Sequence, residues 1–507
     1  MTVAEQLLLP EPGAGPAPHP APGPEFRSWW RRIDADALAW LTEPVARQQR
    51  RRRHRSRRAA RLSRATRRAA RRALTLAVLL PVMLLVAVRV SGLIGDTIMA
   101  TYGLLVLFAT FLVMYVAFAC YDDPAAGAPP RPSLLPRVSC MVAVKDDVEV
   151  IERCVASLLD STYERLELIV VDDCSTDGTA EVLQAMAAVH GFTLLRMPRN
   201  VGKKRALTHA ASMASGGILV FTDSDCIVAP EAIAQCVDAF LADPGIGALS
   251  GHARALNADR SFLTRIQDVW YDGQFSVAKA AESVVGSVTC VSGPLAAFRR
   301  EAVYNYFPAW EGDTFLGREF KFATDRQLTG YVLGQEWVGR RLKARYRASP
   351  FVARRSYPER RWKVQYVRSA RVLTNVPTTA RSLLKQQIRW KKSFIRNLFF
   401  TGTFQWRRGP LPAFLYYGHV LWVVAAPFLA FRHLVWLPLH GQWFYGLVYL
   451  CGVVLKGSIW GVAYKLRNPR SHRWIYRPAM SLVSSLVLSW LLGYAALTLR
   501  KSVWARG

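Results

Sequence analysis

Paired cysteines, acidic residues and an early hydrophobic segment are all scarce in this 507-residue sequence. None of the eight cysteines belongs to a Cys-x-x-Cys pair, which argues against a zinc site or a disulfide framework and indicates free thiols in a reducing compartment. No long apolar run begins before about residue 73, so we expect no signal peptide. Asp and Glu number 36 against 67 Lys and Arg, which gives a formal net charge of +31.

The excess positive charge is concentrated near the N-terminus. Fourteen arginines lie between Arg47 and Arg72, directly before the first apolar stretch. Because the cytoplasmic flanks of membrane helices collect Lys and Arg, we expect this block to be cytoplasmic and to contact anionic lipids. A nucleic-acid-binding arm is the alternative. No neighbouring residues are suited to stacking bases, so we expect no nucleic-acid partner. Residues 1–46 are rich in Pro and Ala and are predicted to be disordered.

Long apolar stretches indicate an integral membrane protein. Five of them contain at most one charged residue each and are about as long as a membrane-crossing helix. They are residues 73–94, 98–121, 411–431, 441–464 and 478–499. We therefore predict two transmembrane helices in residues 73–121 and three or more in residues 411–507. Three C-terminal crossings would place the basic tail Arg500-Lys501 outside, against the positive-inside tendency, so either one segment is re-entrant or a further span exists.

The section between these stretches, residues 122–345, alternates strand-like and helix-like patterns. Strands are expected at residues 138–144, 166–171 and 192–197, and helices at residues 150–159 and 179–190. This alternation predicts an α/β domain with a mostly parallel sheet. Residues 346–410 are basic and aromatic. There we predict amphipathic helices on the membrane surface, at residues 354–371 and 380–396.

Two acids follow a strand pattern that is typical of burial on both faces. Asp223 and Asp225 come directly after the run from Ile218 to Thr222, at the edge of the sheet where open α/β domains bind ligands. Acids are costly to place there without a cation or hydrogen-bond donors, and carboxylate oxygens are the ligands that Mg²⁺ and Mn²⁺ prefer. The alternative for an isolated Asp-x-Asp is a turn that satisfies its own backbone.

Six motifs in one order carry a family resemblance. They are Val171-Asp172-Asp173, Gly202-Lys203-Lys204, Asp223-Ser224-Asp225, Ser292-Gly293-Pro294-Leu295, Asp325-Arg326-Gln327-Leu328-Thr329 and Gln386-Gln387-Ile388-Arg389-Trp390. In this order the chain resembles the processive, membrane-bound family-two glycosyltransferases, which are the cellulose, chitin and hyaluronan synthases, and among them bacterial hyaluronan synthases most closely. The resemblance implies a cytoplasmic α/β domain of the GT-A type, inserted between transmembrane helices of the plasma membrane.

The resemblance also implies roles for particular residues. Asp223 and Asp225 would bind Mg²⁺ or Mn²⁺, and Asp325 would take a proton from the acceptor hydroxyl, with a helix N-cap as the alternative for Asp325. The residues implied in binding the nucleotide-sugar are Asp146, Asp173, Lys203, Asp223, Gln386, Arg389 and Trp390, and the Trp390 ring can also lie beneath the acceptor sugar. The last three fit one helical face, for which an interfacial helix with a Trp anchor is the alternative.

Two positions depart from the family pattern. The Asn-Glu that usually follows the first strand is Lys145-Asp146 here, and the Gly-Asp-Asp of hyaluronan synthases is Ala323-Thr324-Asp325. The implied reaction is inverting transfer from UDP-sugars to a growing β-linked polysaccharide, with export through the membrane. Hyaluronan made from UDP-GlcNAc and UDP-glucuronate is the first expectation, and a chitin-type or other β-glycan is the second. An alternative of a different class is a membrane-anchored protein that binds polyanions through residues 47–72.

Overall fold

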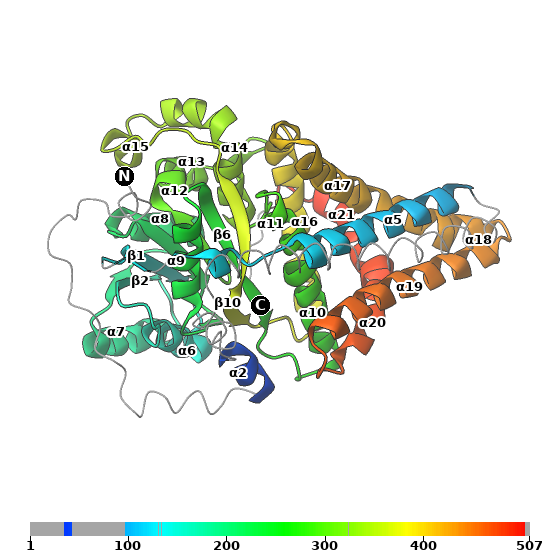
Figure 1. The fold of residues 1–507 in the computed structure, drawn as a ribbon, viewed down its shortest axis with the longest axis horizontal. Helices are drawn as coiled ribbons and strands as arrows, with labels where there is room; N and C mark the ends of the chain where they lie inside the picture. The colour runs from blue at the N-terminus through cyan, green and yellow to red at the C-terminus, as the bar shows by residue number, and fades with distance from the viewer. Residues whose placement is uncertain (1–34, 43–96, 130, 133, 323, 502–507) are drawn as a thin grey trace, which may run out of the picture.

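The core of the α/β domain is an eight-stranded mixed sheet in the order β3-β2-β1-β4-β7-β6-β10-β5. The structure is a computed structural model that describes residues 35–42, 97–129, 131–132, 134–322 and 324–501 (Figure 1). The strands of the sheet are β1 (Val138–Val144), β2 (Leu166–Asp172), β3 (Thr193–Arg196), β4 (Ile218–Asp223), β5 (Cys226–Val228), β6 (Ile246–Ala255), β7 (Ala296–Arg299) and β10 (Lys363–Thr374). Parallel pairing joins β1 to β2 and β4, β2 to β3, and β6 to β10. The predicted α/β fold with a mostly parallel sheet is confirmed.

The central strands form because their apolar side chains are covered on both faces. Every residue of β1 is buried, and β4 is buried from Ile218 to Thr222. The helices of the domain include α6 (Val148–Leu159), α7 (Thr179–His190), α8 (Lys203–Met213), α9 (Ala232–Ala242), α10 (Phe262–Gly273), α13 (Phe307–Glu311) and α14 (Thr324–Arg345). A separate two-stranded hairpin joins β8 (Thr314–Phe315) to β9 (Arg318–Glu319). The elements expected in residues 138–197 therefore form close to their predicted bounds.

A helix lies within the N-terminal region that was expected to be disordered. In α2 (Ala35–Thr42), Leu41 is buried. The guanidinium groups of Arg254 and Arg371 each lie 5.3 Å from the centre of the Trp40 ring, and Arg371 also donates to the Trp40 carbonyl. For these residues the expectation of disorder is wrong, because one Trp between two Arg side chains anchors the helix. The other residues of 1–46, the arginine block 47–72 and the apolar stretch 73–94 lie outside the described residues.

Residues 354–371, expected to form an amphipathic surface helix, instead contain part of a central strand. β10 lies between β6 and β5, and its Tyr366 and Val372 are fully buried. The Arg368 guanidinium, part of the charge that suggested a membrane surface, lies 4.9 Å from the centre of the Tyr121 ring. The helix prediction is wrong. Side chains of the segment are buried at about every second position along much of its length, and this burial stabilises a strand although the segment is charged. The α/β domain therefore extends to Thr374, and α16 (Ala380–Thr401) is the helix that forms as expected.

Four helices of the described chain are long and apolar enough to cross a membrane. They are Ile98–Gly127, which overlaps α5 (Thr97–Tyr115); Pro410–Leu439, which includes α17 (Pro410–Phe431); Trp443–Arg467, which is α19; and Arg473–Leu497, which includes α20 (Arg477–Val483) and α21 (Leu491–Leu497). In Figure 1, α5, α17 and α19 extend together away from the sheet. The predicted apolar stretches from residue 98 onward are therefore helical, as expected for a membrane protein.

The last of these helices differs from the others at its ends. At its start, Arg473 donates to Asp268 of the α/β domain at 2.9 Å. Just beyond its end, the Lys501 carbonyl accepts from Lys392 of α16 at 2.8 Å, and α21 packs against α16. A π-helical segment, Ser484–Leu488, interrupts the helix between α20 and α21. The start of this helix therefore lies beside the α/β domain, and its end lies beside α16.

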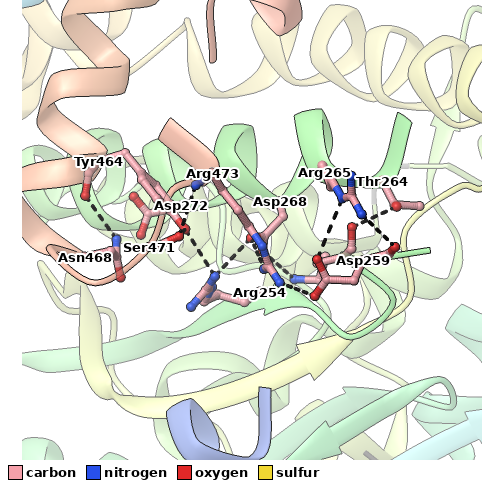
Figure 2. Close-up of polar contacts among 12 residues, drawn as sticks. Arg254, Asp259, Thr264, Arg265, Asp268, Asp272, Tyr464, Asn468, Ser471 and Arg473 are labelled. Carbon is pink, nitrogen blue, oxygen red and sulfur yellow. Dashed lines mark hydrogen bonds and ion pairs between the residues drawn. The ribbon is translucent and has the colours of Figure 1, made fainter. Parts of the chain in front are cut away.

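A polar junction holds the membrane helices against the domain (Figure 2). Oδ2 of Asp268 in α10 accepts from Arg254 of β6 at 3.0 Å and from Arg473 at 2.9 Å. One turn along α10, Asp272 forms an ion pair with Arg467 at the end of α19. Both carboxylates are buried, and breaking such a pair typically costs about 3–5 kcal/mol because one charge stays buried without its partner. The junction therefore fixes α10 between the sheet and the membrane helices.

Candidate functional site

The two acids of the Asp-x-Asp sequence lie where β4 ends and β5 begins. One ligand atom from each of Asp223, Asp225 and Cys226 lies within 4.8 Å of the others. Burial raises the pKa of the Cys226 thiol well above its ordinary value, so this thiol stays neutral. Carboxylate oxygens suit Mg²⁺ or Mn²⁺, whereas a neutral thiol does not. The donor chemistry of Asp223 and Asp225 therefore fits the predicted hard divalent ion.

Lys203, the first residue of α8, contacts one of these two acids. Its ammonium forms an ion pair with Asp223, and the two side chains are 24% and 27% exposed. Gly202, the residue before it, has φ = 86°, a left-handed conformation that favours glycine and lets the chain enter α8 directly. The structure thus brings together Lys203 and Asp223, as expected, in a position that a ligand can reach.

Asp173 and Asp146 lie just beyond the ends of β2 and β1. Both carboxylate oxygens of Asp173 accept backbone hydrogen bonds, from Val201 at 2.7 Å and from Gly202 at 2.9 Å. Burial raises the pKa of Asp173, and these hydrogen bonds oppose the rise. Asp146, with φ = 51°, pairs with Lys145 at 2.9 Å on the exposed rim. Asp173 therefore supports the loop before α8, while Asp146 accepts from Thr176 N–H at 2.7 Å.

Asp325 faces Asp223 across a single glycine. In the first turn of α14, its Oδ2 accepts from Gly293 N at 2.9 Å and its Oδ1 accepts from the Thr324 hydroxyl at 2.6 Å. A Cβ atom on Gly293 would stand only 2.8 Å from Oδ2 of Asp223, so a residue larger than glycine would push this loop away from Asp223. The hollow beside the two acids is lined by residues that include Lys203, Leu207, Phe221, Asp223, Gly293, Trp310, Thr324 and Asp325.

Trp390 forms an aromatic surface that joins α16 to α10. Its ring centre lies 5.7 Å from that of Trp270 and 6.3 Å from that of Tyr271. Trp390 is 37% exposed, so part of this surface is open to a ligand. Sequence reasoning missed Trp270 and Tyr271 as site residues. The signal in the sequence is that these two aromatic residues are consecutive. Their contact with Trp390, however, depends on how α10 and α16, which are distant in the sequence, pack together.

Gln386 connects the aromatic surface to the acids through Tyr271. Burial raises the pKa of the Tyr271 phenol, the nearby charges of Asp225 and Asp223 raise it further, and a hydrogen bond with Gln386 opposes the rise. Tyr271 therefore lies close to both acids and to Gln386. Arg389 is half-buried on the same helix. Of the predicted residues of α16, the structure thus links Gln386 and Trp390 to the site through α10.

The chain is similar in sequence to known glycosyltransferases. Residues 139–307 match the family model "Glycosyl transferase family 2". The chain is 29% identical over 411 residues to an N-acetylglucosaminyltransferase of Rhizobium meliloti (strain 1021), a match that covers 78% of this chain and 88% of that protein. It is 26% identical over 422 residues to a hyaluronan synthase of Streptococcus pyogenes, covering 81% of this chain and 91% of that protein. The resemblance inferred from the motifs is confirmed.

The fold is also similar to that of a solved glycosyltransferase. The structure of a mannosyltransferase from Pyrobaculum calidifontis, in complex with GDP-mannose and Mn²⁺, matches with a TM-score of 0.50 and 19% sequence identity. The match covers 84% of this chain and 100% of that one. At this level of identity the likeness concerns the fold, and it confirms the expected GT-A type.

Proposed function

We propose that this glycosyltransferase, whose residues 139–307 form a family 2 domain, polymerises a β-linked polysaccharide from UDP-sugars. The observation that carries the proposal is the single glycine between Asp223 and Asp325. On the two sides of this glycine lie Asp223, the candidate metal ligand, and Asp325, the candidate base. Both line one hollow, where we place the donor sugar and the acceptor hydroxyl. The similarity to a hyaluronan synthase over 81% of the chain supports repeated transfer.

For the donor, we assign Asp223 and Asp225 to Mg²⁺ or Mn²⁺. The mannosyltransferase with this fold was solved with Mn²⁺, which supports the choice. When bound, the ion would neutralise charge that develops on the diphosphate leaving group. Lys203 beside Asp223 supplies further positive charge, and we assign Arg389 the same role from α16.

For the nucleotide, we assign the rim beyond β1 and β2. Asp173 holds the backbone of Val201 and Gly202, and so sets the course of the loop that leads to Lys203. Asp146 lies on the exposed edge of the same region. Gln386 lies beside Tyr271, whose phenol is close to the two acids that we assign to the metal ion.

For the transfer step, Asp325 is the base. Its carboxylate takes the proton of the acceptor hydroxyl while the hydroxyl oxygen attacks the anomeric carbon from the side opposite UDP. A new glycosidic C–O bond forms, the bond to UDP breaks, and the configuration inverts. Gly293 N–H and the Thr324 hydroxyl hold the carboxylate in one orientation for this step.

Trp390 supplies the flat surface for the acceptor sugar. Changing Trp390 to Ala should lower kcat/KM for transfer about 10-fold and shorten the product, because an exposed ring that packs against a sugar face is removed. UDP affinity should stay unchanged. Trp406, which is 58% exposed and hydrogen-bonded to the Thr403 carbonyl, is the matched control. Equal losses in Trp390→Ala and Trp406→Ala would mean that the effect is not specific to the acceptor.

Hyaluronan is the product we propose first. Purified protein supplied with UDP-GlcNAc and UDP-glucuronate together should form a polymer that hyaluronidase degrades, and either donor alone should give none. Mass spectrometry of the digest identifies the repeat. Polymer from UDP-GlcNAc alone would favour the second candidate, a chitin-type glycan, which the similarity to an N-acetylglucosaminyltransferase supports. Absence of polymer with every donor set would refute the polymerase proposal.

We place the domain on the cytoplasmic face of the plasma membrane, in a multi-pass protein that exports its product through the membrane helices. If Arg473–Leu497 is re-entrant, α17 and α19 form one outward and one inward crossing. The basic tail Arg500-Lys501 then stays on the side of the domain, in agreement with the positive-inside tendency. Anionic lipids beside the arginine block, residues 47–72, complete this arrangement.

A further inference from the structure

Two side chains of opposite charge, Lys279 and Glu282, lie one turn apart and are not part of the site described above. Lys279 ends a π-helical segment, Gln274–Lys279, and Glu282 lies in the short helix α11 (Ala280–Val284). The Lys279 side chain is buried. Burial raises the pKa of Glu282, and the charge of Lys279 opposes that rise. A buried ammonium is costly unless its three protons reach acceptors, so the partners of Lys279 indicate its use.

Lys279 holds one irregular loop against β6. Its Nζ donates to the Cys290 carbonyl, to Oγ of Ser292 at 2.7 Å and to Oγ of Ser250 at 3.2 Å. The backbone N–H of Ser292 donates to the same Ser250 hydroxyl at 3.4 Å. All three protons of the ammonium are therefore placed, and two of them fix the loop at Cys290 and Ser292.

Glu282 holds the preceding residue of that loop. Its two carboxylate oxygens accept from Thr289, one from the backbone N–H at 3.2 Å and the other from the hydroxyl at 2.9 Å. Residues 288–295 form neither helix nor strand. Backbone hydrogen bonds hold the two ends of the loop, from Val288 N–H to the Val364 carbonyl and from Gly251 N–H to the Leu295 carbonyl, while side chains hold the residues between. Lys279 and Glu282 thus hold three of the four positions from 289 to 292, namely residues 289, 290 and 292, from one side.

The other side of the loop contacts the helix that carries the proposed base. Val291 N–H donates to the Thr329 hydroxyl at 2.9 Å, and Gly293 N–H donates to Asp325 Oδ2 at 2.9 Å. Thr329 and Asp325 are one turn apart on α14, and the Thr329 hydroxyl also donates to the Asp325 carbonyl. A displacement of the loop therefore changes the orientation of the Asp325 carboxylate.

The geometry points to Lys279 and Glu282 as a clamp that positions Gly293, and through it Asp325, for sugar transfer. This inference rests on the proposed function. Neither side chain touches the hollow, so both are positioning residues. The clamp also reaches the donor side, because Gly293 lies against Asp223 and the Pro294 carbonyl accepts from Thr222 at 2.7 Å. The loop therefore sets the position of Asp223 relative to Asp325, and the clamp holds the loop in place.

The test compares Lys279→Met with the double variant Lys279→Met/Glu282→Gln. The single variant removes the positive charge that stabilises the Glu282 carboxylate, and it lowers the melting temperature. The double variant removes both charges and recovers part of that loss. If the clamp positions the loop, both variants lower kcat about 100-fold while the affinity for UDP stays within about twofold. Recovery of both stability and kcat in the double variant would overturn the inference, because the loss would then be one of stability.

Hydrogen exchange tests whether the clamp holds the loop, independently of whether the protein transfers sugar. The peptide that covers residues 288–295 should exchange faster in the double variant than in the wild type, whether or not the wild type makes polymer. Faster exchange together with an inactive wild type would leave the loop geometry supported and the proposed function refuted. Unchanged exchange would refute the clamp itself.

Lys343 provides the matched control. It lies toward the far end of α14, about 27 Å along the helix from Asp325 at 1.5 Å per residue. Like Lys279, it donates to a loop carbonyl, that of Tyr357 at 2.6 Å. In addition, it forms an ion pair with Glu359 at 2.7 Å. Lys343→Met should lower stability and leave kcat close to that of the wild type. A loss of kcat equal to that of Lys279→Met would show that any anchoring lysine has this effect, and would contradict the clamp.

Discussion

Changing Asp325 to Asn should lower the rate of sugar transfer by about 10²- to 10⁴-fold, the usual range for loss of a general base. Asn keeps the shape of the side chain and retains an oxygen that accepts from Gly293 N–H. The loop and the hollow therefore stay in place, while the group that takes the acceptor proton is lost. Initial rates of UDP release measure the effect, and calorimetry with UDP should give an unchanged affinity.

Asp238→Asn is the control for this substitution. Asp238 forms an exposed ion pair with Arg131 at 2.9 Å on α9, away from the hollow, and its change should leave the rate unaltered. If Asp325→Asn keeps more than about a tenth of the wild-type rate, Asp325 is not the base. The alternative for this residue, an acid at a helix start that satisfies local N–H groups, would then stand.

The β4 acids could be predicted from sequence because two strong signals coincide. A run of apolar residues identifies a strand covered on both faces, and parallel strands present their carboxyl ends at a common edge. Asp223 and Asp225 follow such a run, and the structure places them at that edge beside Lys203. The order of motifs then added Asp325, whose contact with Gly293 joins segments distant in the sequence.

Other parts of the fold and site depend on packing that leaves no local pattern. β10 contains Lys363, Arg368 and Arg371. This charge favours a surface helix, but in the structure Arg368 lies over the Tyr121 ring and Arg371 over the Trp40 ring. The contact of Trp270 with Trp390 needs α10 and α16 to lie side by side. The polar junction and the sheet impose that arrangement, not the residues adjacent to either Trp.

Thr324 departs from the family pattern, and the structure explains how this residue still supports Asp325. Its hydroxyl donates to Oδ1 of Asp325 at 2.6 Å, so the residue that replaces an acid still contacts the proposed base. An acid there would repel the Asp325 carboxylate unless it were protonated or paired, whereas a hydroxyl donates to it. The chain therefore keeps a defined orientation for Asp325 with a neutral neighbour.

Changing Asp225 to Asn should weaken Mn²⁺ binding in the presence of UDP by about 100-fold or more and abolish measurable transfer. Loss of groups that merely support metal ligands already costs 10- to 100-fold in affinity. An amide oxygen replaces a charged ligand, so the attraction to a divalent ion falls sharply. Electron paramagnetic resonance of added Mn²⁺ measures binding directly, without relying on activity. Removal of metal by a chelator should stop transfer by the wild type, and Mg²⁺ or Mn²⁺ should restore it.

Cys226 provides the control that shows whether the carboxylates or the nearby sulfur bind the metal. Its sulfur lies in the same group of potential ligands, 3.6 Å from Oδ1 of Asp225, yet burial keeps the thiol neutral. Cys226→Ala should therefore change Mn²⁺ affinity by less than about threefold, because a hard ion prefers oxygen to a neutral thiol. A loss in Cys226→Ala as large as that in Asp225→Asn would mean that sulfur is a ligand and that a softer metal such as Zn²⁺ belongs at the site. Wild-type affinity in Asp225→Asn would instead show that these acids form a turn, and that Lys203 alone neutralises Asp223.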